Sequence, residues 1–256
     1  MLNDAGGREK LLAYGVRNVP VVAKGDQFVF GQNLEEVAEF VGLHGTGHTP
    51  LPPEQLIIKW VKVLRATQRF LRQMPNARLN ELVIDNRDRS IRLMGHHVFR
   101  IAEAYLETAA DGVEYAVQLA NVPPAEGAFT TSDEIARYGD GVIARLEQWW
   151  SGLGDKSCQQ KVQTFFGAQP LYMLYERSTW HSAQHARQLT AVLERFGIEP
   201  DGRLTAEDLA GLPLPERLWE KRSGTLRPRP LRHRRRLGGS AREPHRSRIW
   251  RARRGR

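Results

Sequence analysis

Four long stretches of the chain repeat apolar residues at every third or fourth position, which is the pattern of a helix that buries one face. They cover approximately residues 53–74, 87–108, 132–150 and 170–196. The last stretch ends before Gly197, a residue type that is common just beyond a helix C-terminus. Such helices bury their apolar faces most simply against one another. The sequence therefore predicts a mainly α fold built on a four-helix bundle.

The connections between these helices are long. Residues 75–86, 109–131 and 151–169 leave room for crossovers, so the hydrophobic pattern alone does not decide how the helices are connected in space. We expect Ser132 or Asp133 to cap the third helix, because both side chains can accept hydrogen bonds from the first free backbone N–H groups.

Residues 1–43 predict a small α/β unit ahead of the long helices. Residues 9–14 have helical character, and residues 19–23 and 28–30 have the composition of two short strands joined by a turn. A further helix is expected after Asn33, which is a good N-cap residue.

This order of elements resembles the C-terminal half of a glutaredoxin or thioredoxin-like domain. In that family a Val-Pro dipeptide supplies a cis-proline beside the active site, and the resemblance implies this place for Pro20. The family's first strand and its helix with the redox cysteine are missing here, and no cysteine precedes Cys158. We therefore expect no redox catalysis from residues 1–43. The unit is either a remnant or the result of a gene start assigned too late.

Residues 44–53 form a linker rich in glycine and proline, and residues 54–221 hold the predicted helices. His44 and His48 lie in this linker. We do not expect them to be metal ligands, because flexible flanking residues would not hold a ligand geometry.

Charge separates the C-terminal tail from the rest of the chain. The net charge is +9, yet residues 222–256 contain fourteen arginines, no lysine and a single acid. The other 221 residues carry 24 basic and 28 acidic side chains, so nucleic-acid binding by the folded part loses its support. The composition of residues 222–256 predicts disorder. Two explanations of the tail stay open: an out-of-frame translation of a GC-rich gene, or an arm that binds nucleic acid.

The composition also bears on the compartment. No run of about 18 apolar residues is present, so no membrane-spanning helix is expected. The first ten residues have no apolar stretch of the kind found in secretory signals. Cys158 is the single cysteine, which excludes an internal disulfide and agrees with a cytoplasmic location.

The candidate chemistry centres on histidines. His181 and His185 lie four residues apart in the fourth helix, so both imidazoles are on one face and can converge on one metal ion. In the second helix His97 lies at the margin of the buried stripe, whereas His96 belongs to a polar row that we expect to face solvent. One such histidine alone would be read as a buried, hydrogen-bonded side chain. Three that can meet between the helices favour a metal site.

Two strings then carry a resemblance: G-H-H-V-F-R-I-A-E-A-Y in the second helix and E-R-S-T-W-H-S-A-Q-H-A-R-Q-L in the fourth. With them, the chain from about Leu56 to Trp219 resembles the DinB/YfiT-type metal-binding four-helix bundles. In that family one histidine of the second helix and an H-x-x-x-H pair of the fourth bind a divalent metal. The resemblance implies His97, His181 and His185 as ligands, an up-down-down-up bundle and a homodimer.

Three neutral imidazoles with open coordination positions are typical of a catalytic metal site. Some members of the family are thiol S-transferases that use a small thiol, which agrees with the glutaredoxin-like fragment. The expected partners are therefore a small thiol or an electrophile. Hydrolysis of small amides or esters and a non-catalytic stress or adaptor role are the alternatives. Ser182 replaces the glutamate of the H-E-x-x-H motif, which argues against a peptidase.

Four further polar residues of the fourth helix could orient a ligand or a substrate: Glu176, Arg177, Gln184 and Gln188. For the first two, salt bridges on the helix surface are the alternative. The sequence does not distinguish zinc, nickel, iron and manganese as the bound metal.

Overall fold

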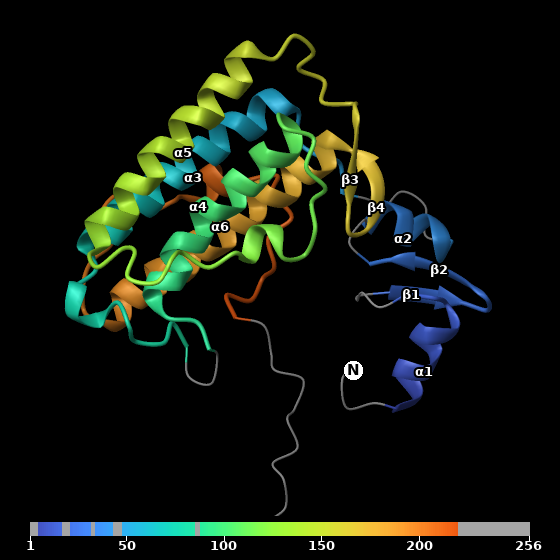
Figure 1. Ribbon diagram of the computed structural model, residues 1–256, viewed down its shortest axis with the longest axis horizontal. Coiled ribbons are helices and arrows are strands. Elements are labelled where there is room, and N and C mark those ends of the chain that lie inside the picture. Colours follow the sequence, from blue (N-terminus) through green and yellow to red (C-terminus); the bar gives the residue numbers. More distant parts are fainter. Residues whose placement is uncertain (1–4, 17–20, 32–33, 43–47, 85–87, 220–256) are drawn as a thin grey trace, which may run out of the picture. The chain divides into compact units, whose positions relative to one another are not determined.

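The computed structural model describes residues 5–16, 21–31, 34–42, 48–84 and 88–219. The fold is mainly helical, as the hydrophobic pattern predicts, and the described residues also form two small antiparallel hairpins (Figure 1). In these residues no helix has the length and apolar character needed to cross a membrane.

Four long helices carry the core. They are α3 (Pro53–Gln73), α4 (Ile91–Ala109), α5 (Ser132–Gly152) and α6 (Leu171–Arg195), and each lies within a predicted stretch to within a few residues. Helices α3 and α4 both pack along α5 and α6 (Figure 1). Their apolar faces share one core, whose largest fully buried side chains include Trp60, Tyr105, Tyr115, Tyr175, Phe70 and Phe99.

The helix starts differ from the prediction in two places. Helix α4 begins after Ser90, whose hydroxyl accepts a hydrogen bond from the backbone N–H of Leu93, so the predicted start near residue 87 is too early. Helix α5 is capped by Thr131, and the expected cap at Ser132 or Asp133 is wrong. Thr131 and Glu134 form a reciprocal capping box that satisfies two free N–H groups.

Helices α4 and α5 approach closely where α5 has no side chain. A Cβ built at Gly139 would lie 2.5 Å from the ring of Phe99 on α4. The glycine thus makes room for an aromatic ring that a larger residue would displace.

The long connections contain short elements that the sequence analysis does not predict. They are η1 (Asn76–Arg78), η2 (Leu119–Asn121) and a hairpin of β3 (Lys161–Thr164) and β4 (Gly167–Pro170). The connection before η2 is pinned to this hairpin, because the Tyr115 N–H donates to the Gln163 carbonyl and the Tyr115 carbonyl accepts from the Phe165 N–H.

The N-terminal unit has the predicted order of elements. It consists of α1 (Ala5–Ala13), the antiparallel pair β1 (Val21–Lys24) and β2 (Gln27–Phe30), and α2 (Leu34–Phe40). Pro20, the predicted cis-proline, lies outside the described residues, as does the C-terminal tail, including the predicted disorder of 222–256.

After α6 the chain forms α7 (Ala206–Leu209) and then runs back along α6. The carbonyl of Pro215 accepts a hydrogen bond from Arg187, and the carbonyl of Leu218 accepts one from Gln184. These contacts place the segment that ends at Trp219 against the face of α6 that carries the histidines.

Candidate metal centre

Three histidine side chains from two helices converge between α4 and α6. One ring nitrogen from each of His97, His181 and His185 lies within 4.8 Å of the other two. The Nε2 atoms of His181 and His185 are 3.1 Å apart. Two nitrogens bound to one tetrahedral zinc at about 2.0–2.1 Å are about 3.3 Å apart, so this separation fits a shared metal ion.

A side-chain relay fixes the ring of His185. Its Nδ1 lies 2.7 Å from the Gln188 Oε1, and the Gln188 Nε2 lies 2.9 Å from the carbonyl of Leu218. Because that carbonyl can only accept a hydrogen bond, the amide must present its NH₂ to Leu218 and its oxygen to His185. Nδ1 of His185 therefore carries the proton, and the lone pair is on Nε2, which faces the Nε2 of His181. This is the tautomer that a metal ligand needs.

His97 is held from the opposite side. Its ring is hydrogen-bonded to the backbone of Ala120 in η2. The position of η2 depends in turn on Arg100, whose Nε donates to the Leu119 carbonyl at 2.9 Å and whose guanidinium pairs with both carboxylate oxygens of Glu107. An outer contact that orients the ring is thus present for His97 as well as for His185.

The rings are kept neutral by their surroundings. Burial lowers the pKa of His97 to about 2, with the neighbouring His185 adding to the effect. Burial also lowers the pKa of His181, again with His185 as the second cause. Neutral imidazoles have the free lone pairs that a divalent cation requires, so the three side chains could hold a metal ion.

His96 does not join this cluster, but the reason differs from the expected one. Only 7% of it is exposed, so the prediction that its row faces solvent is wrong. Its ring packs against those of Tyr138 and Phe129, with centroids 5.3 and 5.6 Å away. Arg100, from the same row, is buried and paired with Glu103 and Glu107. The row is polar, yet α5 and the loop before it cover it.

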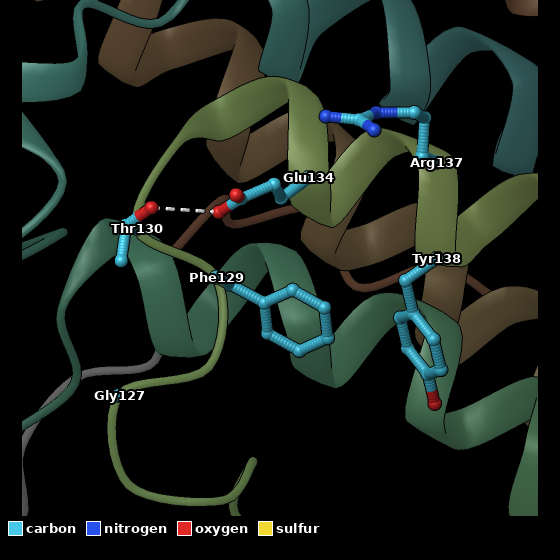
Figure 2. Close-up of a pocket in the computed structure, with 6 residues that line it drawn as sticks. All are labelled: Gly127, Phe129, Thr130, Glu134, Arg137 and Tyr138. Carbon is cyan, nitrogen blue, oxygen red and sulfur yellow. Dashed lines mark hydrogen bonds between the residues drawn. The ribbon is translucent and has the colours of Figure 1, made fainter.

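A surface hollow of about 440 Å³ lies on the far side of these rings. Phe129 and Tyr138 form one side of it, and Glu134 and Arg137 reach it from α5 (Figure 2). The dashed bond in the figure joins the Thr130 hydroxyl to the Glu134 carboxylate. None of the three clustered histidines lines this hollow, so it is separate from the candidate metal centre.

The other predicted polar residues divide into two groups. Gln188 contacts a histidine of the cluster directly, whereas Gln184 binds the backbone of Leu218 and accepts from Arg187. Glu176 is buried and accepts hydrogen bonds from the Leu51 N–H, at 3.1 Å, and from His48, 2.9 Å from its ring. His48 thus has a partner other than a metal, and His44 lies outside the described residues.

Arg177 differs from the expected surface cation. Burial lowers the pKa of its guanidinium, which lies over the rings of Phe165 and Phe166. Ser182, which replaces the glutamate of the peptidase motif, is fully buried and accepts a hydrogen bond of 3.0 Å from the indole of Trp60. It therefore has a packing role between α3 and α6.

Sequence reasoning does not identify Ala120, Leu218 and Arg100 as supports of the site. Two of them act through backbone carbonyls, whose positions carry no signature in residue type. No family model matches the chain, and no curated protein matches it significantly.

Proposed function

We propose that this chain is a DinB-like metalloprotein whose three-histidine centre catalyses transfer of a small thiol to an electrophile. The observation that carries the proposal is the convergence of His97, His181 and His185 with the tautomer of His185 fixed by Gln188. A divalent metal at such a centre supplies a Lewis acid that lowers the pKa of a bound thiol. The proposal includes a four-helix bundle, from the hydrophobic pattern and the family resemblance, and a homodimer, from the resemblance alone. It also includes a cytoplasmic location, from the cysteine content and the N-terminal composition.

The ligand set supports a site with open coordination positions. Three protein ligands are the usual number in catalytic zinc centres, whereas closed structural sites use four. His181 is partly exposed while the other two histidines are buried, so approach of a small molecule past His181 is compatible with the packing.

The surroundings favour thiol chemistry over hydrolysis. A metal-dependent hydrolase commonly uses a nearby carboxylate as general base. The acid nearest in sequence to the histidine pair, Glu176, is engaged by His48 and by the backbone of Leu51, and the position after His181 holds the packed Ser182. Thiol transfer depends less on a general base, because a small thiol already has a pKa near 8–9 and loses its proton readily.

In the proposed reaction the thiol loses its proton to solvent, and its sulfur forms a bond with the electrophilic carbon of the second substrate. The bond from that carbon to the leaving group breaks, and the leaving group departs with the electron pair. The residues of the chain hold the reactants: Gln188 and Ala120 orient the imidazoles of His185 and His97, and the surrounding helices limit access of water.

The test begins with the metal content of the purified protein. We expect about one divalent metal per chain in the wild type and its loss in His97→Ala, His181→Ala and His185→Ala. His96→Ala should keep the metal, because His96 packs against Tyr138 and Phe129 instead. If all three single variants keep stoichiometric metal, the centre is wrong.

Catalysis is tested on the same proteins. Conjugation of 2-mercaptoethanol to monochlorobimane, followed by fluorescence, should be faster with the metal-loaded wild type than with chelator-treated protein or the three ligand variants. Chloride is the leaving group in this assay. A metal-loaded protein that gives no rate above the uncatalysed reaction with any small thiol would support the adaptor role in place of the transferase.

A further inference from the structure

Arg177 is a half-buried cation that forms no ion pair with a carboxylate in the described residues. It precedes His181 by four positions on α6, so the two side chains leave the helix on the same face. Its guanidinium carbon lies 5.8 and 5.6 Å from the ring centroids of Phe165 and Phe166, at the turn between β3 and β4. Its Nε atom is buried and has no hydrogen-bond partner in the described part of the chain.

The adjacent acid does not neutralise this cation. Glu176 points to a different set of partners, the ring of His48 and the N–H of Leu51. The strongest favourable influence on Arg177 comes from the phenol of Tyr115, which is neutral at physiological pH. Removing a guanidinium from water without a counter-charge costs free energy. Packing alone therefore does not explain why an arginine occupies position 177.

Two further hydrogen-bonding groups lie in the same region. The hydroxyls of Tyr115 and Ser178 are buried, with side chains 2% and 0% exposed, and they interact with each other. Neither has another hydrogen-bond partner in the described residues. Arg177 and Tyr115 interact electrostatically. When one hydroxyl donates to the other, one hydroxyl hydrogen and the Nε–H of Arg177 are left without an acceptor in the described part of the chain. Buried donors of this kind are normally satisfied, which indicates an acceptor supplied by a ligand.

The electrostatics of the metal centre point to an anionic acceptor. The positive charge of Arg177 acts on His181, and that of Arg89 acts on both His97 and His181. With a divalent cation added, this region would favour a ligand that brings negative charge.

We infer that Arg177, with Tyr115 and Ser178, binds the carboxylate of a small substrate whose thiol reaches the three-histidine centre. A carboxylate matches the planar fork of a guanidinium with two parallel hydrogen bonds, and the remaining hydrogen of the Tyr115–Ser178 hydroxyl pair supplies a further donor. The inference rests on the proposed function, because it assigns the second contact of the thiol substrate at that same centre.

The test compares three thiols with the same two-carbon spacer on the full-length protein loaded with cobalt(II). They are 3-mercaptopropionate, 2-mercaptoethanesulfonate and 2-mercaptoethanol, and their affinities are measured from the near-ultraviolet thiolate-to-cobalt absorption. We expect the carboxylate to bind about tenfold or more tightly than the alcohol, since charge-assisted hydrogen bonds are the strong ones. Arg177→Met should abolish this preference and leave the affinity for the alcohol unchanged.

Control variants separate recognition from folding. Arg137→Met removes an exposed arginine of α5 that pairs with Asp133, and it should change none of the three affinities. Tyr115→Phe removes only a hydroxyl, so it should weaken the carboxylate preference about threefold even if Arg177→Met does not fold. Cobalt content and the thermal unfolding midpoint of each variant are measured alongside.

The inference is overturned if 3-mercaptopropionate keeps its advantage in Arg177→Met, if the sulfonate binds best, or if the wild type shows no preference. Failure of the proposed function would give a different result, because the wild type would then take up no cobalt. In that case calorimetry of propionate binding to the wild type and Arg177→Met decides the carboxylate site without a metal. Binding that depends on Arg177 supports the site, and its absence overturns it.

Discussion

Gln188 is the residue that determines which nitrogen of His185 carries the proton. It links the imidazole to the Leu218 carbonyl, and the orientation of its amide follows from that carbonyl. Gln184 donates to the same carbonyl, but its oxygen accepts a hydrogen bond from Arg187. Substituting each glutamine in turn therefore distinguishes two effects. Both side chains attach the C-terminal segment, but Gln188 also orients the ring of His185.

We expect Gln188→Leu to weaken metal binding about 10- to 100-fold, because loss of an outer partner leaves the tautomer of His185 undetermined. Gln184→Leu should change the affinity less than about threefold, although it loosens the same segment. Competition with a chromophoric chelator measures both dissociation constants. Equal weakening by the two substitutions would show that the segment, and not the tautomer, supports the metal.

At this scale the sequence predicts which three histidines come together but not the residues that support them. Spacing places His181 and His185 on one face, and the position of His97 beside a buried stripe leads to the third member. The prediction that His96 faces solvent is wrong for a physical reason. A polar row of side chains can be buried when its charges are paired, as Arg100 is with Glu107. Periodicity reports which residues share a face, and a loop such as the one with Phe129 can still cover that face.

Among the helices, the close contact between α4 and α5 depends on a glycine, Gly139, which has no side chain to separate them. A methyl group at Gly139 would overlap the ring of Phe99, which is fully buried and has little room to move. Two positions further along the same helix, a Cβ at Gly141 would meet no atom within 4 Å. Both glycines lie inside α5, so their intrinsic helix propensities are the same.

Gly139→Ala should therefore lower the free energy of unfolding by about 1–3 kcal/mol, the usual cost of overpacking a core. Gly141→Ala should raise it by about 0.4–1 kcal/mol, because alanine reduces the entropy of the unfolded chain and suits a helix. Urea unfolding of both variants tests the difference. Stabilisation by both substitutions would mean that α4 and α5 are further apart than described.

The elements that the sequence misses are the short ones. Strands β3 and β4 have four residues each, and among the described residues they pair with one another and with Tyr115, which forms a bridge to Thr164. Four residues contain too few alternations to stand out from a loop. The long helices repeat their pattern over five or more turns, which is why their positions, but not their caps, follow from the sequence.

For the whole molecule, the neutral buried histidines link stability to pH. The pKa of His97 is lowered to about 2 in the folded chain, whereas in the unfolded chain it returns to about 6.5. Below pH 6.5 the unfolded state therefore binds a proton that the folded state does not, and acid favours unfolding. The lowered pKa of His181 acts in the same direction.

The unfolding free energy of the metal-free protein should thus be highest above pH 6.5 and fall on acidification, by up to about 1.4 kcal/mol per pH unit for His97. Urea titrations of chelator-treated protein at pH 7.5, 6.5 and 5.5 give the slope. Under the same conditions His97→Gln should show a shallower dependence. A stability that is independent of pH between 7.5 and 5.5 would contradict neutral burial of these rings.

The contact between Gln188 and Leu218 also has a consequence for the order of events during synthesis. All three histidines leave the ribosome before residue 218 does, so a nascent chain carries its imidazoles while His185 still lacks the contact that selects its tautomer. Chains grow at about 5–20 residues per second, and this interval lasts on the order of seconds. In the proposed metalloprotein, a metal that binds in that time would be held less firmly than after release, so a wrong ion could still dissociate. The finished chain would then retain the ion that is bound when its C-terminal segment closes.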